Sequence, residues 1–233
     1  VDVALVKASD GTAISSVNDL SYSGGTATFT PAAQSVVTEA AIKVTDVSGN
    51  FTTSSSSVIL GTTGNDSITG SSSNDIIFAF GGADTIVGGL GVDTIVGGAG
   101  SNTYTFSTTT ATDTTNTIAN MDVVIGADVG NIFDLSALPN YDANSFTIDL
   151  DPASVGNNDY IASWTTTVGG VTTTNYVYLK DAALSGGFGF TESAGVVTLD
   201  VPAVISSGPL TSLLGGQQHG HFWQFLERYT NRS

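Results

Sequence analysis

Oxygen-bearing side chains recur at a fixed spacing in the middle of this chain. Four aspartates and one asparagine stand nine residues apart, at Asp66, Asp75, Asp84, Asp93 and Asn102. An apolar or aromatic residue follows each of them two positions later, at Ile68, Ile77, Ile86, Ile95 and Tyr104. A chance acid at a regular spacing would not bring the apolar residue with it. The pattern therefore predicts a repeated structural unit that presents oxygen ligands to a hard cation.

Each nine-residue unit combines a glycine-rich turn with a very short strand. Glycine adopts the positive φ angles that tight turns need. In the x-apolar-x triplet after each aspartate, only the middle side chain points inward, because side chains alternate across a strand. The period thus predicts a flattened parallel β-roll in which two units make one coil and the apolar residues form a thin core.

Turns two units apart stack on the same side of such a roll. We expect one calcium site between Asp66 and Asp84, and a second between Asp75 and Asp93. A third between Asp84 and Asn102 is expected to be weaker, since asparagine brings no charge. Backbone carbonyls of the turns complete the all-oxygen ligand set that Ca²⁺ prefers. The turn glycines assigned to these sites are Gly61, Gly64, Gly70, Gly82, Gly88, Gly89, Gly91 and Gly97.

The repeats resemble the RTX (repeats-in-toxin) nonapeptide Gly-Gly-x-Gly-x-Asp-x-U-x, where U is apolar. Residues 88–96 match this pattern completely. The other units depart from it, at Thr62, Ser71, Ser73, Ala79, Phe80 and Asn102. The resemblance implies bound calcium, export through a type I secretion channel and folding triggered by calcium outside the cell. A flexible Gly/Ser-rich linker is the alternative interpretation of this segment.

Composition narrows the classes of partner. The 233 residues include 21 acidic residues against 5 Lys plus Arg, a net charge of −16. That balance argues against nucleic acid and anionic membrane surfaces, which attract basic proteins. The chain has no cysteine, so disulfides cannot brace it. No apolar run approaches the roughly 20 residues of a membrane span.

Short β-strands are expected on both sides of the roll, which makes the chain all-β. Residues 1–59 form one β region, and residues 40–52 resemble the last strands of a bacterial immunoglobulin-like domain. The roll occupies residues 60–106, and residues 107–207 continue and cap it. Within that range, Asp122–Ile125 and Phe133–Leu138 resemble the segment that closes the roll in serralysin-type proteases. Val168–Val171 predicts a β-hairpin turn.

Residues 208–233 form a tail of different character. Apolar residues at helical spacing predict a short amphipathic helix, at Phe222, Phe225, Leu226 and Tyr229. This helix is interpreted as an uncleaved export signal, with a helix docked on its own domain or an appended non-native segment as alternatives. Because the chain starts at Val1, we expect a processed form, a fragment, or a protein whose export signal is not at its amino terminus.

Nothing in the sequence indicates catalysis. Nucleophile-elbow, zinc-protease and cysteine-nucleophile motifs are absent from the sequence. The two histidines, His219 and His221, are expected to lie in a solvated segment rather than to bind a metal. Asp149 and Asp151 are expected to be surface charges or further calcium ligands rather than an acid–base pair.

Two functions remain. The first is a calcium-binding RTX module of a secreted surface-layer protein or adhesin at the bacterial cell surface. Such a module would assemble with itself or with other surface components. The alternative is the carboxy-terminal calcium and secretion module of an exoenzyme, a protease or lipase, with its catalytic domain upstream.

Overall fold

The computed structural model describes residues 2–14, 17–23, 26–54, 57–106, 121–154, 159–182 and 189–200. The chain divides into two units, Val1–Pro202 and Ala203–Ser233, and all of the described residues lie in the first. The described part is entirely β, which confirms the predicted class. No helix capable of crossing a membrane occurs within these ranges. The predicted helix of the tail lies outside the described residues.

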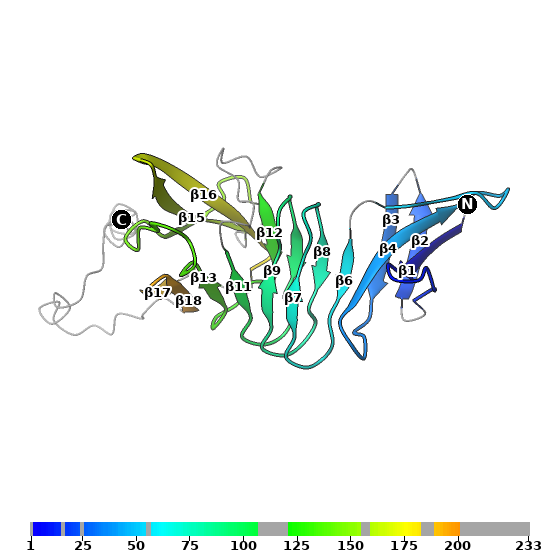
Figure 1. Ribbon diagram of the computed structural model, residues 1–233. Coiled ribbons are helices and arrows are strands. Elements are labelled where there is room, and N and C mark those ends of the chain that lie inside the picture. Colours follow the sequence, from blue (N-terminus) through cyan, green and yellow to red (C-terminus); the bar gives the residue numbers. More distant parts are fainter. Residues whose placement is uncertain are drawn as a thin grey trace, which may run out of the picture. The chain divides into compact units, whose positions relative to one another are not determined.

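Eighteen strands make up the described structure (Figure 1). Those of the roll, β6 to β13, are only three or four residues long, as the triplet of each repeat predicts. The strands are β1 (Asp2–Lys7), β2 (Val17–Ser23), β3 (Thr26–Pro31), β4 (Thr38–Thr45), β5 (Phe51–Thr53), β6 (Val58–Leu60), β7 (Ser67–Thr69), β8 (Ile76–Phe78), β9 (Thr85–Val87), β10 (Thr94–Val96), β11 (Thr103–Thr105), β12 (Asp122–Ile125), β13 (Ile132–Asp134), β14 (Thr147–Leu150), β15 (Tyr160–Val168), β16 (Val171–Lys180), β17 (Gly189–Ser193) and β18 (Val196–Asp200).

The short strands alternate between two parallel sheets (Figure 1). One sheet contains β6, β8, β10 and β12 in this order, and the other contains β7, β9, β11 and β13. Strands two units apart are partners, so that Ile77 pairs with Ile95 and Ile68 pairs with Ile86. This register confirms the predicted parallel β-roll with one coil per two units.

A single column of side chains fills the space between the two sheets. All five residues of the predicted column are at most 3 % exposed: Ile68, Ile77, Ile86, Ile95 and Tyr104. Each fully buried isoleucine contributes about 1.5–3 kcal/mol relative to an exposed one. The column continues into an aromatic cluster toward the last coils, where Phe146 and Trp164 stack with ring centroids 6.3 Å apart. With one inward side chain from each nine-residue unit, this core is thin for so many turn residues.

Longer strands, which pair antiparallel with one another, cover the last coil. β16 pairs in parallel with β12 and carries β15 and β14 beyond it. On the other sheet, β18 pairs antiparallel with β13. The hairpin predicted at Val168–Val171 is confirmed, because these two residues pair across the turn between β15 and β16. Such covers protect strand edges that would otherwise be free to pair with other chains.

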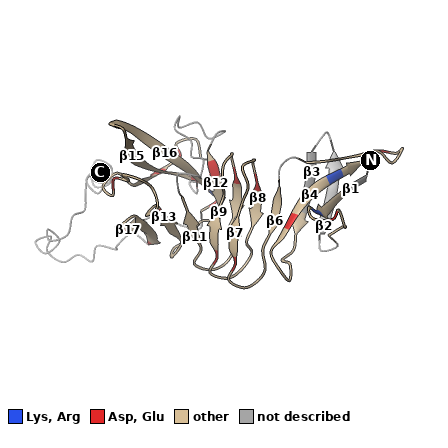
Figure 2. Ribbon diagram, in the orientation of Figure 1, with Lys and Arg blue, Asp and Glu red and all other residues tan. Residues whose placement is uncertain are grey.

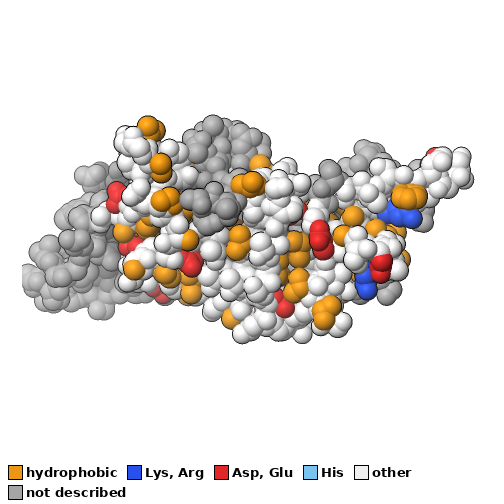
Figure 3. Space-filling model, in the orientation of Figure 1, with side chains coloured by type: hydrophobic (Ala, Val, Ile, Leu, Met, Phe, Trp, Pro, Cys, Tyr) orange, Lys and Arg blue, Asp and Glu red, His pale blue; other side chains and the backbone are white. Residues whose placement is uncertain are grey.

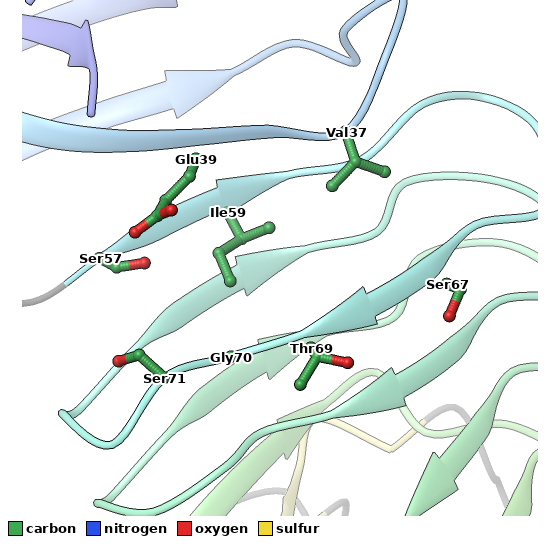
Figure 4. A pocket seen from close by; sticks show the side chains of 8 residues that line it. All are labelled: Val37, Glu39, Ser57, Ile59, Ser67, Thr69, Gly70 and Ser71. Atoms are coloured by element: carbon green, nitrogen blue, oxygen red, sulfur yellow. The ribbon is translucent and has the colours of Figure 1, made fainter. Parts of the chain in front are cut away.

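The amino-terminal strands continue one sheet of the roll. β4 pairs antiparallel with β6, with Glu39 opposite Ile59, and β1 pairs with β4. The other sheet ends at β7. A hollow of about 360 Å³ lies between these strands (Figure 4), lined by Val37, Glu39, Ser57, Ile59, Ser67, Thr69, Gly70 and Ser71. The immunoglobulin-like resemblance of residues 1–59 stays a prediction.

Consecutive turns of the roll are stacked in close backbone contact. Gly98 has φ +75°, and a Cβ built there would stand 1.8 Å from the carbonyl oxygen of Phe80 in the preceding coil. That oxygen accepts a hydrogen bond from the Ala99 N–H at 2.7 Å. Phe80 itself has φ +73° at a position where the repeat favours glycine, and its ring stacks on Phe78. The positive φ of the turn favours glycine but admits Phe80, whereas the space between the coils at Gly98 excludes any Cβ.

We predict that Gly98→Ala destabilises the roll more than Gly126→Ala. Both residues have nearly the same φ, but a Cβ on Gly126 meets nothing within 4 Å. Gly126→Ala should cost about 1 kcal/mol, the price of a left-handed alanine. Gly98→Ala should cost roughly 1–3 kcal/mol more, because the stacked turns must separate. Urea denaturation with saturating calcium measures both values, and equal losses would contradict close stacking of the turns.

Candidate calcium sites

The sixth residues of the repeats stand above one another in two ladders. Asp75 and Asp93 form one of them, and Asp122 continues it; we call this the three-aspartate ladder. The other, the mixed ladder, contains Asp66, Asp84 and Asn102. All but Asp66 are at most 2 % exposed. The structure thus brings together within each ladder the residues that the sequence placed two units apart.

Every rung of a ladder is held by the same hydrogen bond. The backbone N–H of one residue donates to the Oδ1 atom of the residue one coil later. The donor–acceptor distance is 2.8 Å from Asp66 to Asp84 and 2.8 Å from Asp75 to Asp93. It is 3.1 Å from Asp84 to Asn102. These bonds fix the orientation of each carboxylate or amide and direct its second atom into the turn.

The second carboxylate oxygens of the middle coil have no partner. The Oδ2 atoms of Asp84 and Asp93 are buried, and neither accepts a hydrogen bond. Leaving such an acceptor unsatisfied costs on the order of 1–3 kcal/mol, and more when the group is charged. A bound cation would supply the missing interaction at both positions.

The first coil differs, because both carboxylate oxygens have hydrogen-bond partners within their own unit. In Asp66 the Oδ2 atom accepts the Thr62 N–H at 2.7 Å, and the Thr62 hydroxyl donates to Oδ1 at 3.0 Å. Ser71 makes the same two contacts with Asp75. Thr62 and Ser71 occupy the second position of their units, where the repeat favours glycine. Backbone N–H groups therefore satisfy the Oδ2 atoms at the start of the roll, and the two hydroxyls satisfy the Oδ1 atoms.

The first glycine of a unit leaves room for oxygen atoms from two coils. A Cβ on Gly70 would stand 2.8 Å from Oδ2 of Asp75 and 1.9 Å from the carbonyl oxygen of Gly88. A Cβ on Gly61 would likewise meet Oδ2 of Asp66 at 2.9 Å and the carbonyl oxygen of Ala79 at 2.7 Å. In front of each of these glycines, a carboxylate oxygen of the same unit thus lies close to a carbonyl oxygen of the next coil.

The same space is filled by neutral groups at the end of the mixed ladder. A Cβ on Gly97 would stand 2.2 Å from the Tyr104 hydroxyl and 2.8 Å from Nδ2 of Asn102. This amide nitrogen donates toward the Gly98 carbonyl at 3.4 Å. A donor thus occupies the place that a carboxylate oxygen takes in the other units, so Asn102 is a poorer cation ligand than the aspartates.

The other predicted glycines support the stacking of the turns. A Cβ on Gly82, Gly89 or Gly91 would stand at most 2.8 Å from a backbone atom of the coil below. Gly88 faces Oδ2 of Asp93, 2.5 Å from its Cβ position. Gly64 has only the Thr62 hydroxyl within 4 Å. Apart from Gly64, the predicted glycines thus divide into those that border the ladders and those that allow the coils to approach.

Burial raises the pKa of three ladder carboxylates. Desolvation raises the pKa of Asp93 to about 6, against the lowering effect of its hydrogen bond from the Asp75 N–H. Desolvation also raises the pKa of Asp122 to about 7 and raises that of Asp84. The charge of the preceding aspartate adds to each shift. These shifts mean that negative charge in the ladders lacks compensation from the protein itself.

The chain offers the roll no positive side chain. No Lys, Arg or His occurs between Lys43 and Lys180, a span that covers every repeat. Figure 2 marks an acidic position on β12 and a lysine on β4. On the face drawn in Figure 3, the lysine side chains lie over the amino-terminal strands. An external cation is therefore the available source of compensating charge for the buried aspartates.

Side chains alone do not complete a metal site. Within the described ranges, no group of three or more His, Cys, Asp or Glu side chains converges. Calcium requires 6–8 oxygen ligands at about 2.3–2.6 Å. One or two carboxylates must therefore be completed by turn carbonyls such as those of Ala79 and Gly88. The unpartnered carboxylate oxygens and the oxygen-lined space in front of the first glycines fit this requirement.

Sequence reasoning missed two features of the ladders. The side chains of Asn65 and Asn74 accept N–H groups of the next coil, from Ala83 at 2.9 Å and from Val92 at 3.0 Å. They occupy a variable position of the repeat, so only their recurrence nine residues apart signalled a role. The second feature is Asp122, which stands 29 residues after Asp93. The same interval separates Asn102 from Asn131, and this repetition was the available signal.

The other candidate residues lie elsewhere. Asp149 is an exposed residue of β14, as expected for a surface charge. Asp151 is not a surface charge, because it is 5 % exposed and accepts the Tyr178 hydroxyl at 3.1 Å; its alternative role as a further calcium ligand stays a prediction. Asp151 follows the end of β14, so the alternation of side chains along a strand did not apply to it. His219 and His221 lie outside the described residues.

The solved structures similar to part of the chain include two subunits of one enzyme. One is the AlgE6R2 subunit of the mannuronan C5-epimerase from Azotobacter vinelandii, 23 % identical over 55 % of this chain and 87 % of that chain, with a TM-score of 0.34. The other is the AlgE6R3 subunit of the same enzyme, 22 % identical over 62 % of this chain and 94 % of that chain, with a TM-score of 0.22. At these scores, no property of those subunits transfers to this chain. No curated protein matches it.

A family model identifies the repeats. The RTX calcium-binding nonapeptide repeat matches residues 51–80, 60–95 and 78–106, which include both ladders up to Asn102. The expected cofactor is thereby confirmed. The roll is built from RTX nonapeptide repeats, structural modules that bind calcium.

Proposed function

We propose that this chain is the calcium-binding RTX module of a secreted bacterial surface-layer protein or adhesin, which folds outside the cell when calcium binds. The observation that carries the calcium part is the pair of buried, unpartnered oxygens on Asp84 and Asp93. A chain that buries these carboxylates without a basic residue nearby needs cations to become stable. Bacterial cytosol holds little calcium and the exterior holds much, so folding would follow export.

The proposed ligands follow the two ladders. One calcium ion binds between Asp66 and Asp84, and another between Asp75 and Asp93. A weaker site uses Asp84 and Asn102. The carbonyls of the turns complete each shell, while Gly61, Gly70 and Gly88 keep open the space in front of the carboxylates.

The surface role rests on composition and on the flanking strands. The chain is acidic, poor in lysine and free of cysteine, and β-strands flank the roll on both sides. These features suit an extracellular structural protein without catalysis of its own, which assembles with itself or with other surface components. Type I secretion machinery would export it.

A second candidate function is favoured by one segment. Phe133–Leu138 resembles the sequence that closes the roll in serralysin-type proteases, and here β13 pairs with β11 as the next coil. The chain would then be the calcium and secretion module of an exoenzyme whose catalytic domain precedes it. The two functions differ in whether the isolated chain assembles.

We predict that calcium reverses the pH dependence of stability. In the unfolded chain, an aspartate has a pKa of about 3.9, whereas folding raises that of Asp93 to about 6 and that of Asp122 to about 7. Between about pH 4 and pH 7 the calcium-free folded chain holds more protons than the unfolded chain, so its stability falls as pH rises. With saturating calcium, protons compete for the same carboxylates, and stability rises with pH.

Thermal melts followed by circular dichroism at pH 5 and pH 8 measure this effect, in calcium-free buffer and in millimolar calcium. Without calcium, the expected result is a melting transition at pH 5 that is lost or strongly weakened at pH 8. With calcium, the melting temperature should be higher at pH 8 than at pH 5. The same sign of pH dependence in both buffers would show that the ladder carboxylates do not bind calcium.

We predict that millimolar calcium assembles the purified chain into sheets or filaments. The same concentration of magnesium serves as the control, because it screens the net charge of −16 but fits an open carbonyl-rich site poorly. Sedimentation velocity and negative-stain electron microscopy follow the assembly. A chain that folds with calcium yet stays monomeric would favour the exoenzyme module instead.

A further inference from the structure

The three-aspartate ladder extends beyond the nonapeptide repeats. Asp122 lies outside the residues that match the family model, which end at residue 106. It begins β12, which pairs in parallel with β10 and places Val124 opposite Ile95. The side chain of Asp122 is 2 % exposed. An interruption of the repeat thus leaves the next coil in register with the last one.

Asp122 has the same position relative to Asp93 as Asp93 has relative to Asp75. The Asp93 N–H donates to Oδ1 of Asp122 at 2.9 Å, and the corresponding distance from Asp75 to Asp93 is 2.8 Å. The backbone rungs also agree, at 2.8 Å from the Val123 N–H to the Asp93 carbonyl and 2.9 Å from the Thr94 N–H to the Asp75 carbonyl. The hydrogen bonds of a repeat rung are therefore reproduced without the repeat sequence.

A buried oxygen without a partner marks this part of the ladder. Asp93 is 0 % exposed, and its Oδ2 atom accepts no hydrogen bond, while its Oδ1 atom holds the Asp75 N–H. Three carboxylates are stacked here, whereas the mixed ladder changes from aspartate to asparagine after Asp84. Negative charge is thus concentrated where the chain crosses from the repeats to the capping strands.

We propose that Asp122 and Asp93 hold a further calcium ion, beyond the nonapeptide repeats. The inference rests on the proposed function, since it assumes that the ladders bind calcium. It makes Asp93, rather than Asp84, the carboxylate shared by two fully charged sites. Because β12 also pairs with β16, an ion at Asp122 would couple the calcium-dependent coils to the strands that cap them.

Native mass spectrometry of the whole chain in calcium tests this site by counting bound ions. Asp122→Asn keeps an oxygen acceptor for the Asp93 N–H but loses the charge, so it should bind one calcium ion fewer than the unaltered chain. Asp149→Asn is the matched control, because it removes one carboxylate from an exposed position of β14, and it should leave the count unchanged. An unchanged count and affinity in Asp122→Asn would overturn the further site.

Two results separate this inference from the function beneath it. If Asp84→Asn lowers the calcium count and Asp122→Asn does not, the further site falls and the proposed function stands. If the unaltered chain binds no calcium, both fall. A crystal structure of the unaltered chain grown with calcium decides the matter without any variant: an ion within about 2.3–2.6 Å of oxygens from both Asp93 and Asp122 is expected, and its absence refutes the site.

Discussion

The structure depends on the compensation of buried negative charge. Two ladders of stacked side chains run through the turns of the roll, and Asp84 and Asp93 each carry a buried oxygen without a partner. Between Lys43 and Lys180 the chain supplies no basic residue to balance them. A thin apolar column cannot offset both this electrostatic cost and the conformational entropy of many turn residues. In the proposed function, calcium supplies the missing interaction, and its binding would be coupled to folding.

Close stacking of the turns makes this compensation possible. Glycines such as Gly70 let the carbonyl of one coil approach the carboxylate of the coil beside it. The same hydrogen bond, from the backbone of one coil to the side chain of the next, orients each ladder residue. Backbone contact, side-chain orientation and cation binding are therefore one structural device. Thr62 and Ser71 modify it at the first coil, where their backbone N–H groups and hydroxyls together satisfy the carboxylates.

The nine-residue period was sufficient to predict the roll, because the spacing of Asp66 to Asn102 fixes the turns and that of Ile68 to Tyr104 fixes the core. The same period could not predict Asp122, since the number of residues in an interruption is not set by any repeating contact. Nor could it predict that β4 pairs with β6, because strand pairing across unlike segments depends on tertiary packing. The burial of Asp151 was not predicted, because this residue lies beyond the end of β14, where the alternation of side chains along a strand no longer applies.

Far-UV circular dichroism of the whole chain tests the central claim most directly. The spectrum would be recorded in calcium-free buffer at neutral pH and then with calcium raised stepwise to millimolar concentration, the range of weak extracellular sites. The account predicts a largely unfolded spectrum at the start and a cooperative gain of β signal as calcium binds. A full β spectrum in calcium-free buffer, unchanged by calcium, would show that the ladders are stable without a cation and would contradict it.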